Sequence, residues 1–377
     1  MTVLRVDTLA GIGSTGAGTV LDGSFSFTSQ NYVILPKGTT NDRVGVGSTA
    51  GALRYNTDSN KVELWDGSQW AEVQSSRPDL NGGARGIFGG GATAPGTATN
   101  TIDYINISST GNAVSFGQLT QARYYHGSCS SSTRGVYGGG ETPVRQSTVD
   151  YITISSTGNA ISFGSLLTAK SGNAACSNST RGLFAGGYIP SPGGDTNVIE
   201  YITISSTGNS VSFGQLTQAR RALGSTANAT RGIWAGGVNV ATNVNTIDYV
   251  TISTLGNATR FGDLTAVLPN TAACANATRG IIGNGNSPSR NNIINYITIA
   301  SLGNAINFGD LTVGSLQSAA VASPTRGVFG GGYRDALAFS NVIDYVTILT
   351  QGNAVNFGQL TVKRSTVAGC SNAHGGL

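Results

Sequence analysis

Charged residues are scarce in this chain of 377 residues, making up 11% of it against about 25% in an average soluble protein. The formal net charge is +4 and no block of basic residues occurs, so a nucleic-acid-binding domain is not expected. No stretch approaches the roughly 18 consecutive apolar residues that a membrane-spanning helix needs. No helical period is present either. These absences exclude basic DNA- or RNA-binding proteins, helical membrane proteins and helical repeats.

Two further absences bear on the chemistry of the chain and on whether it is secreted. It has only two histidines, His126 and His374, and they form no metal-binding constellation with its four cysteines. We therefore expect no metal and no other cofactor. The first residues, MTVLRVDTLAGIGSTG, lack a basic start followed by a long apolar run. No secretion signal is expected, and the protein should be soluble.

Glycine is abundant, with 55 of 377 residues, and near-copies of the segment YITISSTGNAVSFGQLT occur six times. A TRG-x-x-GG signal lies about thirty residues before most copies. The arginines of this signal are Arg85, Arg134, Arg181, Arg231, Arg279 and Arg326, and the phenylalanines of the matching Phe-Gly pairs are Phe116, Phe163, Phe213, Phe261, Phe308 and Phe357. A period near fifty, built of strand-like segments and glycine-rich turns, is typical of β-propeller blades rather than of helical repeats.

Each repeat contains four segments that alternate apolar and polar residues. In the second repeat the first three expected strands are 124–130, 135–140 and 149–155. The segment AVSFGQL at 113–119, with its match in the next repeat within 160–166, is expected to close the blade as a fourth strand. The turn SSTGN between the third and fourth strands places Gly-Asn where a positive φ is needed. Four antiparallel strands per repeat make one propeller blade.

The repeat resembles the kelch family at each landmark. Glycine runs match the double glycine of that family, although the fifth repeat departs with GIIGNGN; they are Gly89–Gly91, Gly138–Gly140, Gly186–Gly187, Gly236–Gly237 and Gly330–Gly332. The repeated tyrosines match the kelch tyrosine, and the Phe of each Phe-Gly pair stands where kelch has tryptophan; the tyrosines are Tyr104, Tyr151, Tyr201, Tyr249, Tyr296 and Tyr345. The resemblance covers residues 84–377. It implies an architecture and says little about activity.

The two ends of the repeat region complement each other. The first repeat begins at its second strand, and the segment 365–377 reads as a first strand with no blade after it. Together they would complete one blade without leaving edge strands. We therefore predict an all-β protein, a six-bladed kelch-like β-propeller preceded by an extended N-terminal arm and a small β-module. The predicted boundaries are an arm at 1–35, the module at 36–76, a linker at 77–83 and the propeller at 84–377.

Other repeated residues are interpreted as structural. The cysteines occupy one position in four different blades, where small core residues near the axis are expected and disulfides are not; they are Cys129, Cys176, Cys274 and Cys370. An acid precedes most of the repeated tyrosines, with Asn295 in its place once; the acids are Asp103, Asp150, Glu200, Asp248 and Asp344. Six near-equivalent positions matched in number by six arginines suggest an inter-strand or inter-blade device rather than catalysis.

The residues before the repeats carry a second resemblance. The run ILPKGTT…LRYNTDSNKVELWDGSQW, within residues 34–70, is similar to a module of bacteriophage tail fibres and other virion appendage proteins. That resemblance implies a small β-module next to a virion anchor, commonly in homotrimers. The Gly-, Ser- and Thr-rich residues before it would form the anchoring arm.

The loops of the predicted propeller divide between two faces. Loops SNxTRG and SSTGN are nearly identical in most repeats and share one face, whereas the loops on the other face diverge and are free to serve recognition. We expect the divergent face to carry the ligand-binding residues; the candidates are Tyr124, Tyr125, His126, Arg145, Tyr188, Arg220, Arg221, Arg290, Tyr333, Arg334, Lys363 and Arg364. Lys170 is expected there too, and the acids of this face are Glu141, Asp195 and Asp335.

This basic excess, with scattered tyrosines, suits an anionic glycan or another anionic surface. The same residues could equally be ordinary solvated loop residues. Our leading hypothesis is a phage virion appendage, a tail fibre or fibre-like decoration, that binds a host-surface glycan and is not an enzyme. Its partners would be other virion proteins through the arm and copies of itself, a trimer being favoured. It would be assembled in the host cytoplasm and located on the phage tail or the capsid exterior, without binding nucleic acid or inserting into a membrane.

Three alternatives remain open from the sequence. A purely structural virion adaptor or decoration protein would use the propeller as a spacer. A propeller enzyme acting on polysaccharide would need paired carboxylates or metal ligands near the axis, and few unrepeated acids are available. A cellular kelch-type adaptor would usually carry a helical partner domain, for which there is no pattern.

Overall fold

The computed structural model describes residues 35–43, 50–59, 61–73, 84–191, 193–286, 289–334 and 338–377. These residues form β-strands and one short 3-10 helix, which confirms the all-β prediction. The chain divides into two units, Met1–Arg77 and Pro78–Leu377. Nearly all of the predicted arm at 1–35 and the whole linker at 77–83 lie outside the described residues. Among the residues described, no helix has the length and apolarity required to cross a membrane.

The first unit contains a small four-stranded sheet. In spatial order its strands are β1 (Lys37–Gly38), β2 (Leu53–Asn56), β3 (Lys61–Trp65) and β4 (Trp70–Glu72), with the 3-10 helix η1 (Thr40–Asp42) between β1 and β2 in sequence. β1 runs parallel to β2, and the other pairs are antiparallel. The buried carboxylate of Glu63 accepts hydrogen bonds from Arg43 and Asn56. A small β-module is therefore present where the sequence predicts one.

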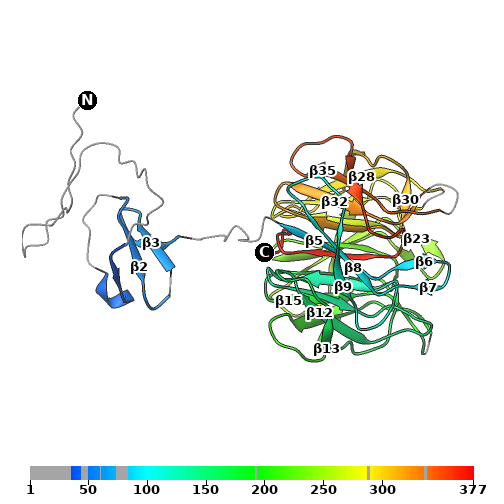
Figure 1. Ribbon diagram of the computed structural model, residues 1–377, viewed down its shortest axis with the longest axis horizontal. Helices are drawn as coiled ribbons and strands as arrows, with labels where there is room; N and C mark the ends of the chain where they lie inside the picture. The colour runs from blue at the N-terminus through cyan, green and yellow to red at the C-terminus, as the bar shows by residue number, and fades with distance from the viewer. Residues whose placement is uncertain are drawn as a thin grey trace, which may run out of the picture. The chain divides into compact units, whose positions relative to one another are not determined.

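The described part of the second unit forms six four-stranded antiparallel sheets, consistent with propeller blades (Figure 1). The first strands, in sheet order 1 to 6, are β37 (Ala368–Ser371), β10 (Gly127–Ser130), β14 (Ala174–Ser177), β20 (Gly224–Ala227), β26 (Ala272–Ala275) and β31 (Ala319–Ala322). The second strands are β5 (Arg85–Gly89), β11 (Arg134–Gly138), β15 (Arg181–Ala185), β21 (Arg231–Ala235), β27 (Arg279–Gly283) and β32 (Arg326–Gly330).

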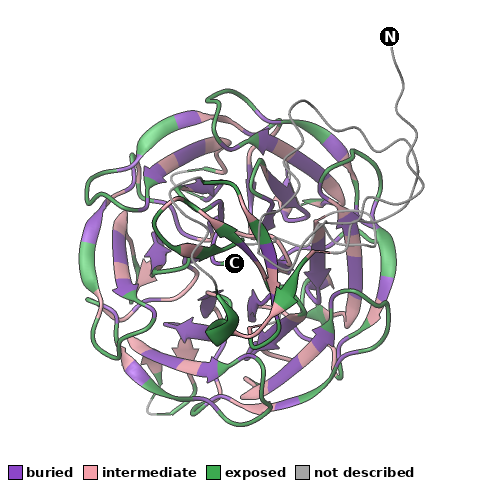
Figure 2. Cartoon of the chain, turned by 90° about the vertical axis from the view of Figure 1, so that its left-hand side faces the viewer, coloured by how far each residue is buried: buried purple, intermediate pink, exposed green. Residues whose placement is uncertain are grey.

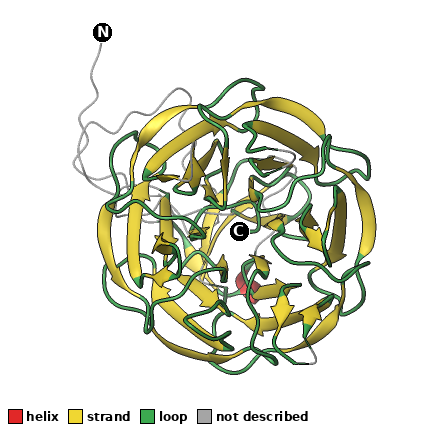
Figure 3. Cartoon of the chain, turned by 90° about the vertical axis from the view of Figure 1, so that its right-hand side faces the viewer, coloured by secondary structure: helices red, strands yellow, loops and turns green. Residues whose placement is uncertain are grey.

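The outer half of each sheet follows the same order. The third strands are β8 (Thr101–Asn106), β12 (Thr148–Thr153), β18 (Val198–Thr203), β24 (Thr246–Thr251), β28 (Ile293–Thr298) and β35 (Val342–Thr347). The fourth strands are β9 (Val114–Gln118), β13 (Ile161–Ser165), β19 (Val211–Gln215), β25 (Thr259–Asp263), β29 (Ile306–Asp310) and β36 (Val355–Gln359). The first strands contact one another around a common centre (Figure 3).

Sheet 1 combines strands from both ends of the repeat region. β37 pairs with β5, so that Ala368 lies opposite Gly89 and Ser371 opposite Gly86. β37 also contacts β10 of sheet 2 and β31 of sheet 6. The predicted union of the two ends in one sheet is therefore confirmed.

The Phe-Gly pair and the SSTGN turn join neighbouring sheets. The amide of Gly158 donates to the carbonyl of Phe116, and the amide of Ala160 donates to that of Gln118, both at 2.8 Å. A Cβ on Gly117 would lie 2.1 Å from the Gly158 carbonyl oxygen, so only glycine fits. Equivalent bonds join every sheet to the next, including sheet 6 to sheet 1 through Gly111 and Phe357. These turns are uniform because each one bonds its neighbour.

The arginine of each TRG signal also reaches the next sheet. Arg134 stacks over Tyr151 at 4.6 Å and donates to the carbonyl oxygens of Ile204 and Ser205. Each of the six arginines donates to the corresponding isoleucine carbonyl of the following sheet; those isoleucines are Ile154, Ile204, Ile252, Ile299, Ile348 and Ile107. Since their donors are used in this way, the arginines are not the partners of the repeated acids, which corrects that part of the interpretation.

The repeated acids pair instead with cations in the loops that lead into the first strands. The fully buried Asp248 accepts from the fully buried Arg220 at 2.9 Å and from the Thr217 hydroxyl. Arg123 pairs with Asp150 and Arg364 with Asp103 in the same way. Each pair ties a loop to the third strand of its own sheet. The acids are therefore structural, as predicted, with different partners.

Three sheets depart from this pair of Arg and Asp, and in each of them the departure at one position is compensated by another residue. In sheet 3 the longer acid Glu200 meets the shorter cation Lys170. In sheet 5 the acid is replaced by Asn295, and the cation position holds the buried Leu268. In sheet 6 that position holds Ser315, and Arg334 from another loop supplies the guanidinium to Asp344. A buried charge thus occurs only with its partner, as its desolvation cost requires.

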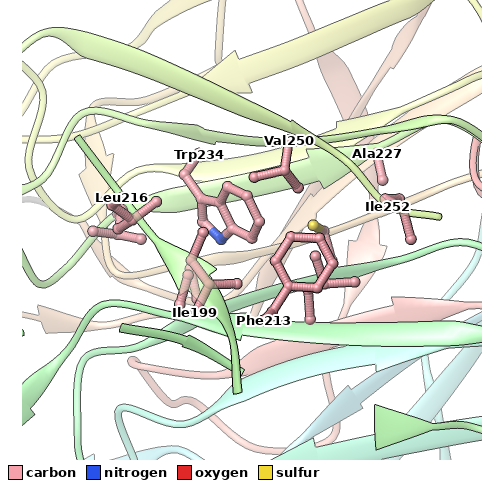
Figure 4. Close-up of a cluster of buried hydrophobic side chains, with 12 residues drawn as sticks. Ile199, Phe213, Leu216, Ala227, Trp234, Val250 and Ile252 are labelled. Atoms are coloured by element: carbon pink, nitrogen blue, oxygen red, sulfur yellow. The ribbon is translucent and has the colours of Figure 1, made fainter. Parts of the chain in front are cut away.

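The hydrophobic core lies between the sheets. Each cluster of buried apolar side chains takes residues from two neighbouring sheets. Between sheets 3 and 4, Ile199 and Phe213 face Trp234 and Val250 (Figure 4). Trp234 is fully buried. The sheets therefore depend on one another for burial.

The cysteines fill small spaces in this core. Each Sγ lies 2.5 to 3.0 Å from the position that a Cβ on the TRG glycine of the next sheet would take; the pairs are Cys370 with Gly135, Cys129 with Gly182, Cys176 with Gly232 and Cys274 with Gly327. Thr226 and Val321 take the same place in sheets 4 and 6. Burial raises the pKa of the thiols of Cys176, Cys274 and Cys370 to about 12. The expectation of small buried core residues is confirmed.

The first prediction concerns the buried pair of sheet 4. Arg220→Leu or Asp248→Asn alone leaves a buried charge unpaired and should lower the free energy of unfolding by about 3 to 5 kcal/mol. The double variant copies the Leu268 and Asn295 of sheet 5 and should lose less than either single variant. Urea unfolding followed by circular dichroism measures all three. Additive losses would contradict the interpretation.

The second prediction concerns the thiols. Because the thiolate is the reactive form, burial and the raised pKa should keep all four cysteines unreactive toward Ellman's reagent in the native protein. All four should react after unfolding in guanidinium chloride. Rapid labelling of any thiol in the native protein would show that the centre of the six sheets opens.

Candidate functional site

The divergent loops gather at the end of the sheets that also carries the short hairpins. These hairpins are β6 (Ala92–Ala94) with β7 (Thr97–Ala98), β16 (Tyr188–Ile189) with β17 (Gly194–Asp195), β22 (Val238–Asn239) with β23 (Thr242–Asn243), and β33 (Tyr333–Arg334) with β34 (Ala338–Phe339), joined by β30 (Ser315–Leu316). The C-terminus lies at the opposite end, near the centre (Figures 1 and 2). The loops into the first strands and those after the second strands thus share one face, called the divergent face below.

A ring of six residues surrounds the centre of the divergent face. Each lies two residues before a first strand and has a φ between 53° and 69°; we call them the mouth ring, and they are Tyr125, Gly172, Ala222, Asn270, Gln317 and Thr366. Successive members are joined by backbone hydrogen bonds, for example from Gly172 N to Tyr125 O at 2.7 Å and from Ala222 N to Gly172 O at 2.8 Å. Backbone atoms therefore fix these positions and leave their side chains free to differ.

A cavity of about 400 Å³ opens beside the mouth ring, within the range of small-ligand sites. Gly172 and Ala222 line it, and these are the two ring members with the smallest side chains. Tyr125 and Gln317 also line it, and the Gln317 amide donates to the Tyr125 hydroxyl at 2.7 Å. The space exists because two neighbouring ring positions lack bulk.

Two arginines and a tyrosine form the outer wall of this cavity. The guanidinium carbons of Arg145 and Arg221 lie 4.4 Å and 5.5 Å from the centre of the Tyr188 ring. Arg221 donates to the buried carboxylate of Asp195 at 2.5 Å. Glu141 lies 3.8 Å from Arg145 Nε. Burial and the neighbouring Glu141, which the Tyr124 hydroxyl also contacts by a hydrogen bond, raise the pKa of Tyr124.

The structure brings together four of the predicted ligand-binding residues. Tyr125, Arg145, Tyr188 and Arg221 line the cavity. Tyr124 lies beside it, with its ring centre 5.3 Å from that of Tyr125. Arg290, Tyr333 and Lys363 do not line this cavity, and Lys363 is exposed. Whether any of these residues binds a ligand remains a prediction.

Four other candidates, and Lys170, are buried rather than exposed on the divergent face, so their expected place on that surface was wrong. Arg220 and Arg364 are fully buried in the ion pairs with the repeated acids, and Arg334 is 9% exposed for the same reason. Lys170 is buried against Glu200. His126 is 6% exposed and packs on Tyr137 with ring centres 5.9 Å apart. The three arginines and Lys170 are held in ion pairs, and all five side chains are largely removed from the surface that a soluble ligand would contact.

These corrections change the electrostatics of the divergent face. Four of the cations expected there are neutralised inside the protein, and Arg221 is paired with Asp195. Asp335, one of the three acids expected to oppose them, lies outside the described residues. The large basic excess predicted from sequence therefore shrinks to a few cations, and attraction of a polyanion by net charge loses most of its support.

Sequence reasoning missed the contribution of the mouth ring. Gly172, Ala222, Asn270 and Gln317 line the cavity but were not candidates, and Glu141 was counted only as a counter-charge. A signal was present in the sequence. Alignment of the repeats on their first strands shows one position that holds Tyr, Gly, Ala, Asn, Gln and Thr in turn, which is greater variety than a packing position would tolerate.

His374 anchors the C-terminal segment at the other end of the centre. Its Nε2 lies 3.0 Å from the carbonyl oxygen of Ser130, and its Nδ1 accepts from the amide of Gly376 at 3.0 Å. A neutral ring with the proton on Nε2 satisfies both bonds. Burial lowers the pKa of His374 below its usual 6.5, and burial followed by the nearby Arg123 lowers that of His126 further below it.

The third prediction follows from these two histidines. Because their folded-state pKa values lie below the unfolded value of 6.5, their contribution is fully present above that pH and is lost as the pH falls. Each should lower the free energy of unfolding by at most about 1.4 kcal/mol per pH unit below it. His374→Gln should flatten this dependence in urea unfolding between about pH 7.5 and pH 5. An unchanged slope would show that the ring is not held neutral.

Known proteins offer little direct guidance to this site. No protein-family model matches the chain, and no match was found among the curated proteins. Within the ranges that the structure describes, there is no group of three or more His, Cys, Asp or Glu residues that could hold a metal ion. Function is therefore inferred from the cavity, its loops and the first unit.

Proposed function

We propose that the chain is a bacteriophage virion appendage protein, a tail fibre or fibre-like decoration. Its six sheets would form a closed kelch-like β-propeller that displays the divergent face for host-surface glycan recognition. The similarity of residues 34–70 to the tail-fibre module supports the virion assignment, and the sheet of the first unit agrees with it. The repeated Phe-Gly contact between sheets 6 and 1 supports closure.

The observation that carries the recognition role is the cavity on the divergent face. It combines guanidinium groups, an aromatic ring, a carboxylate and amide groups in a space of about 400 Å³. Its lining comes from several loops that differ from repeat to repeat, whereas the loops of the other face are uniform because they hold the sheets together. Weak sites of this kind gain avidity when several copies act together.

The entry point of the chain into the second unit agrees with display. Ala84, its first described residue, accepts a hydrogen bond from the amide of Ile107 at 2.8 Å. This contact lies at the end of β5 that carries the uniform loops, opposite the cavity. The described chain of the second unit therefore begins at the face opposite the cavity.

A structural role in the virion is the second candidate, and the fourth strands favour it. Their first residues are exposed and apolar in five of the six sheets; they are Val114, Ile161, Val211, Ile306 and Val355, each more than half exposed. Exposed apolar side chains of this kind suit packing against neighbouring subunits. An adaptor or decoration protein would use this outer surface rather than the cavity.

Cryo-electron microscopy of a virion that contains this chain separates the two candidates, and this is the fourth prediction. We expect propeller density that stands free of its neighbours, with the face bearing Arg145 and Arg221 toward solvent. The trimer and the virion contacts of the first unit would be visible in the same map. Density with that face packed against other subunits would reject recognition by the cavity and favour the adaptor.

A further inference from the structure

We propose that the cavity binds one acidic sugar residue and that Arg145 holds its carboxylate. This inference rests on the proposed glycan recognition and names the ligand class of that site. It depends on a local arrangement of donors and acceptors rather than on the net charge of the face.

Arg145 is the cation of the cavity that is held least tightly, by a long ion pair with Glu141 and not by a direct hydrogen bond to a carboxylate. Its Nε is buried and has no hydrogen-bond partner among the described residues, and the nearest carboxylate, of Glu141, lies 3.8 Å away. Arg221, by contrast, already donates to Asp195 at 2.5 Å. The side chain of Arg145 is 32% exposed, so a ligand can reach it. A guanidinium whose ion pair is this long can also bind the carboxylate of a ligand, through two parallel hydrogen bonds.

Tyr188 fixes the position of this guanidinium before any ligand arrives. The ring lies 4.4 Å from the guanidinium carbon of Arg145, and stacking of this kind restricts the side chain without using its N–H donors. Tyr188 is itself held by the backbone bonds between its own residue and Ser171. The Arg145 side chain then loses less conformational entropy when a ligand binds.

The other polar groups of the cavity match the hydroxyls of a sugar. Gln317 Oε1 is buried and unpartnered among the described residues, while its Nε2 donates to Tyr125. The Tyr125 hydroxyl can still donate its own proton, and the Glu141 carboxylate accepts. Acceptors and a guanidinium within one cavity suit a ligand that has both hydroxyl groups and a carboxylate. A simple inorganic anion would leave the acceptors unmatched.

Space for the sugar ring is provided at Gly172 and Ala222. The equivalent mouth-ring positions 270 and 317 hold Asn and Gln at a φ of 60°. Gln is therefore compatible with the backbone at position 222, where φ is 57°. Ala222→Gln should fill the cavity without disturbing the sheets, and it provides a steric test that is independent of charge.

The experiment, and the fifth prediction, uses the purified full chain with matched sugars. Glucuronate, galacturonate and N-acetylneuraminate are the acidic probes, glucose and galactose are the neutral counterparts, and acetate is the carboxylate control. Binding is measured by saturation-transfer NMR and calorimetry. At least one acidic sugar should bind at least tenfold more tightly than its neutral counterpart and than acetate. Arg145→Gln should weaken that binding at least tenfold, and Ala222→Gln should abolish it.

Lys363→Gln is the control for charge, because Lys363 is exposed and does not line the cavity; it should leave binding unchanged. Thermal unfolding of each variant shows whether the fold is kept, and Arg145→Gln decides the matter if Ala222→Gln does not fold. Equal binding of acidic and neutral sugars, or no binding of any, would overturn the inference. Should the virion map nevertheless show the divergent face on the host surface, recognition would stand and only this ligand class would fall.

Discussion

Close contact between the backbone of each fourth strand and the turn of the next sheet is the constraint on which the structure depends. The glycine of the Phe-Gly pair must lack a Cβ, because at Gly117 it would lie 2.1 Å from the Gly158 carbonyl oxygen. The turn must present the Gly158 and Ala160 amides to the carbonyls of Phe116 and Gln118. Uniformity of both motifs along the chain follows from this geometry. The face that carries the turns is therefore committed to holding the sheets together, and recognition is left to the other face.

The buried ion pairs show how the same core accepts several solutions. Asp248 with Arg220, Glu200 with Lys170, and Asn295 with Leu268 occupy equivalent places, and each keeps charge and length in balance. Because removing one partner of such a pair strands a buried charge, its loss must be compensated, either by a change at the other position, as in sheet 5, or by a cation from elsewhere, as Arg334 does in sheet 6. The pairs also withdraw cations from the surface. The divergent face consequently depends on the local fit of Arg145 and its neighbours rather than on net charge.

The sequence predicted the repeat, the four strands of each sheet and the sharing of one sheet by both ends, because all of these follow from spacing and alternation. It did not predict which loop cations are buried. Arg220 and Arg221 are adjacent, yet the first is fully buried against Asp248 and the second lines the cavity. Both arginines belong to the same loop, so the composition of that loop cannot show which of them is buried. Burial depends instead on how many residues lie between each arginine and the first strand that follows. The loss of the cation at position 268 together with the acid at 295 was the available signal. The cavity escaped prediction because loops far apart in the sequence form it.

The mouth ring explains how such a cavity can arise on a repeated scaffold. From Tyr125 to Thr366 its successive members are joined by hydrogen bonds from one backbone to the next, as from Asn270 N to Ala222 O at 2.8 Å. The side chain at each position can then change without loss of the bonds that fix it. The cavity lies where two neighbouring positions carry small residues, Gly172 and Ala222. Ligand preference on this face can therefore change through the ring and the adjoining loops while the contacts between the sheets stay the same.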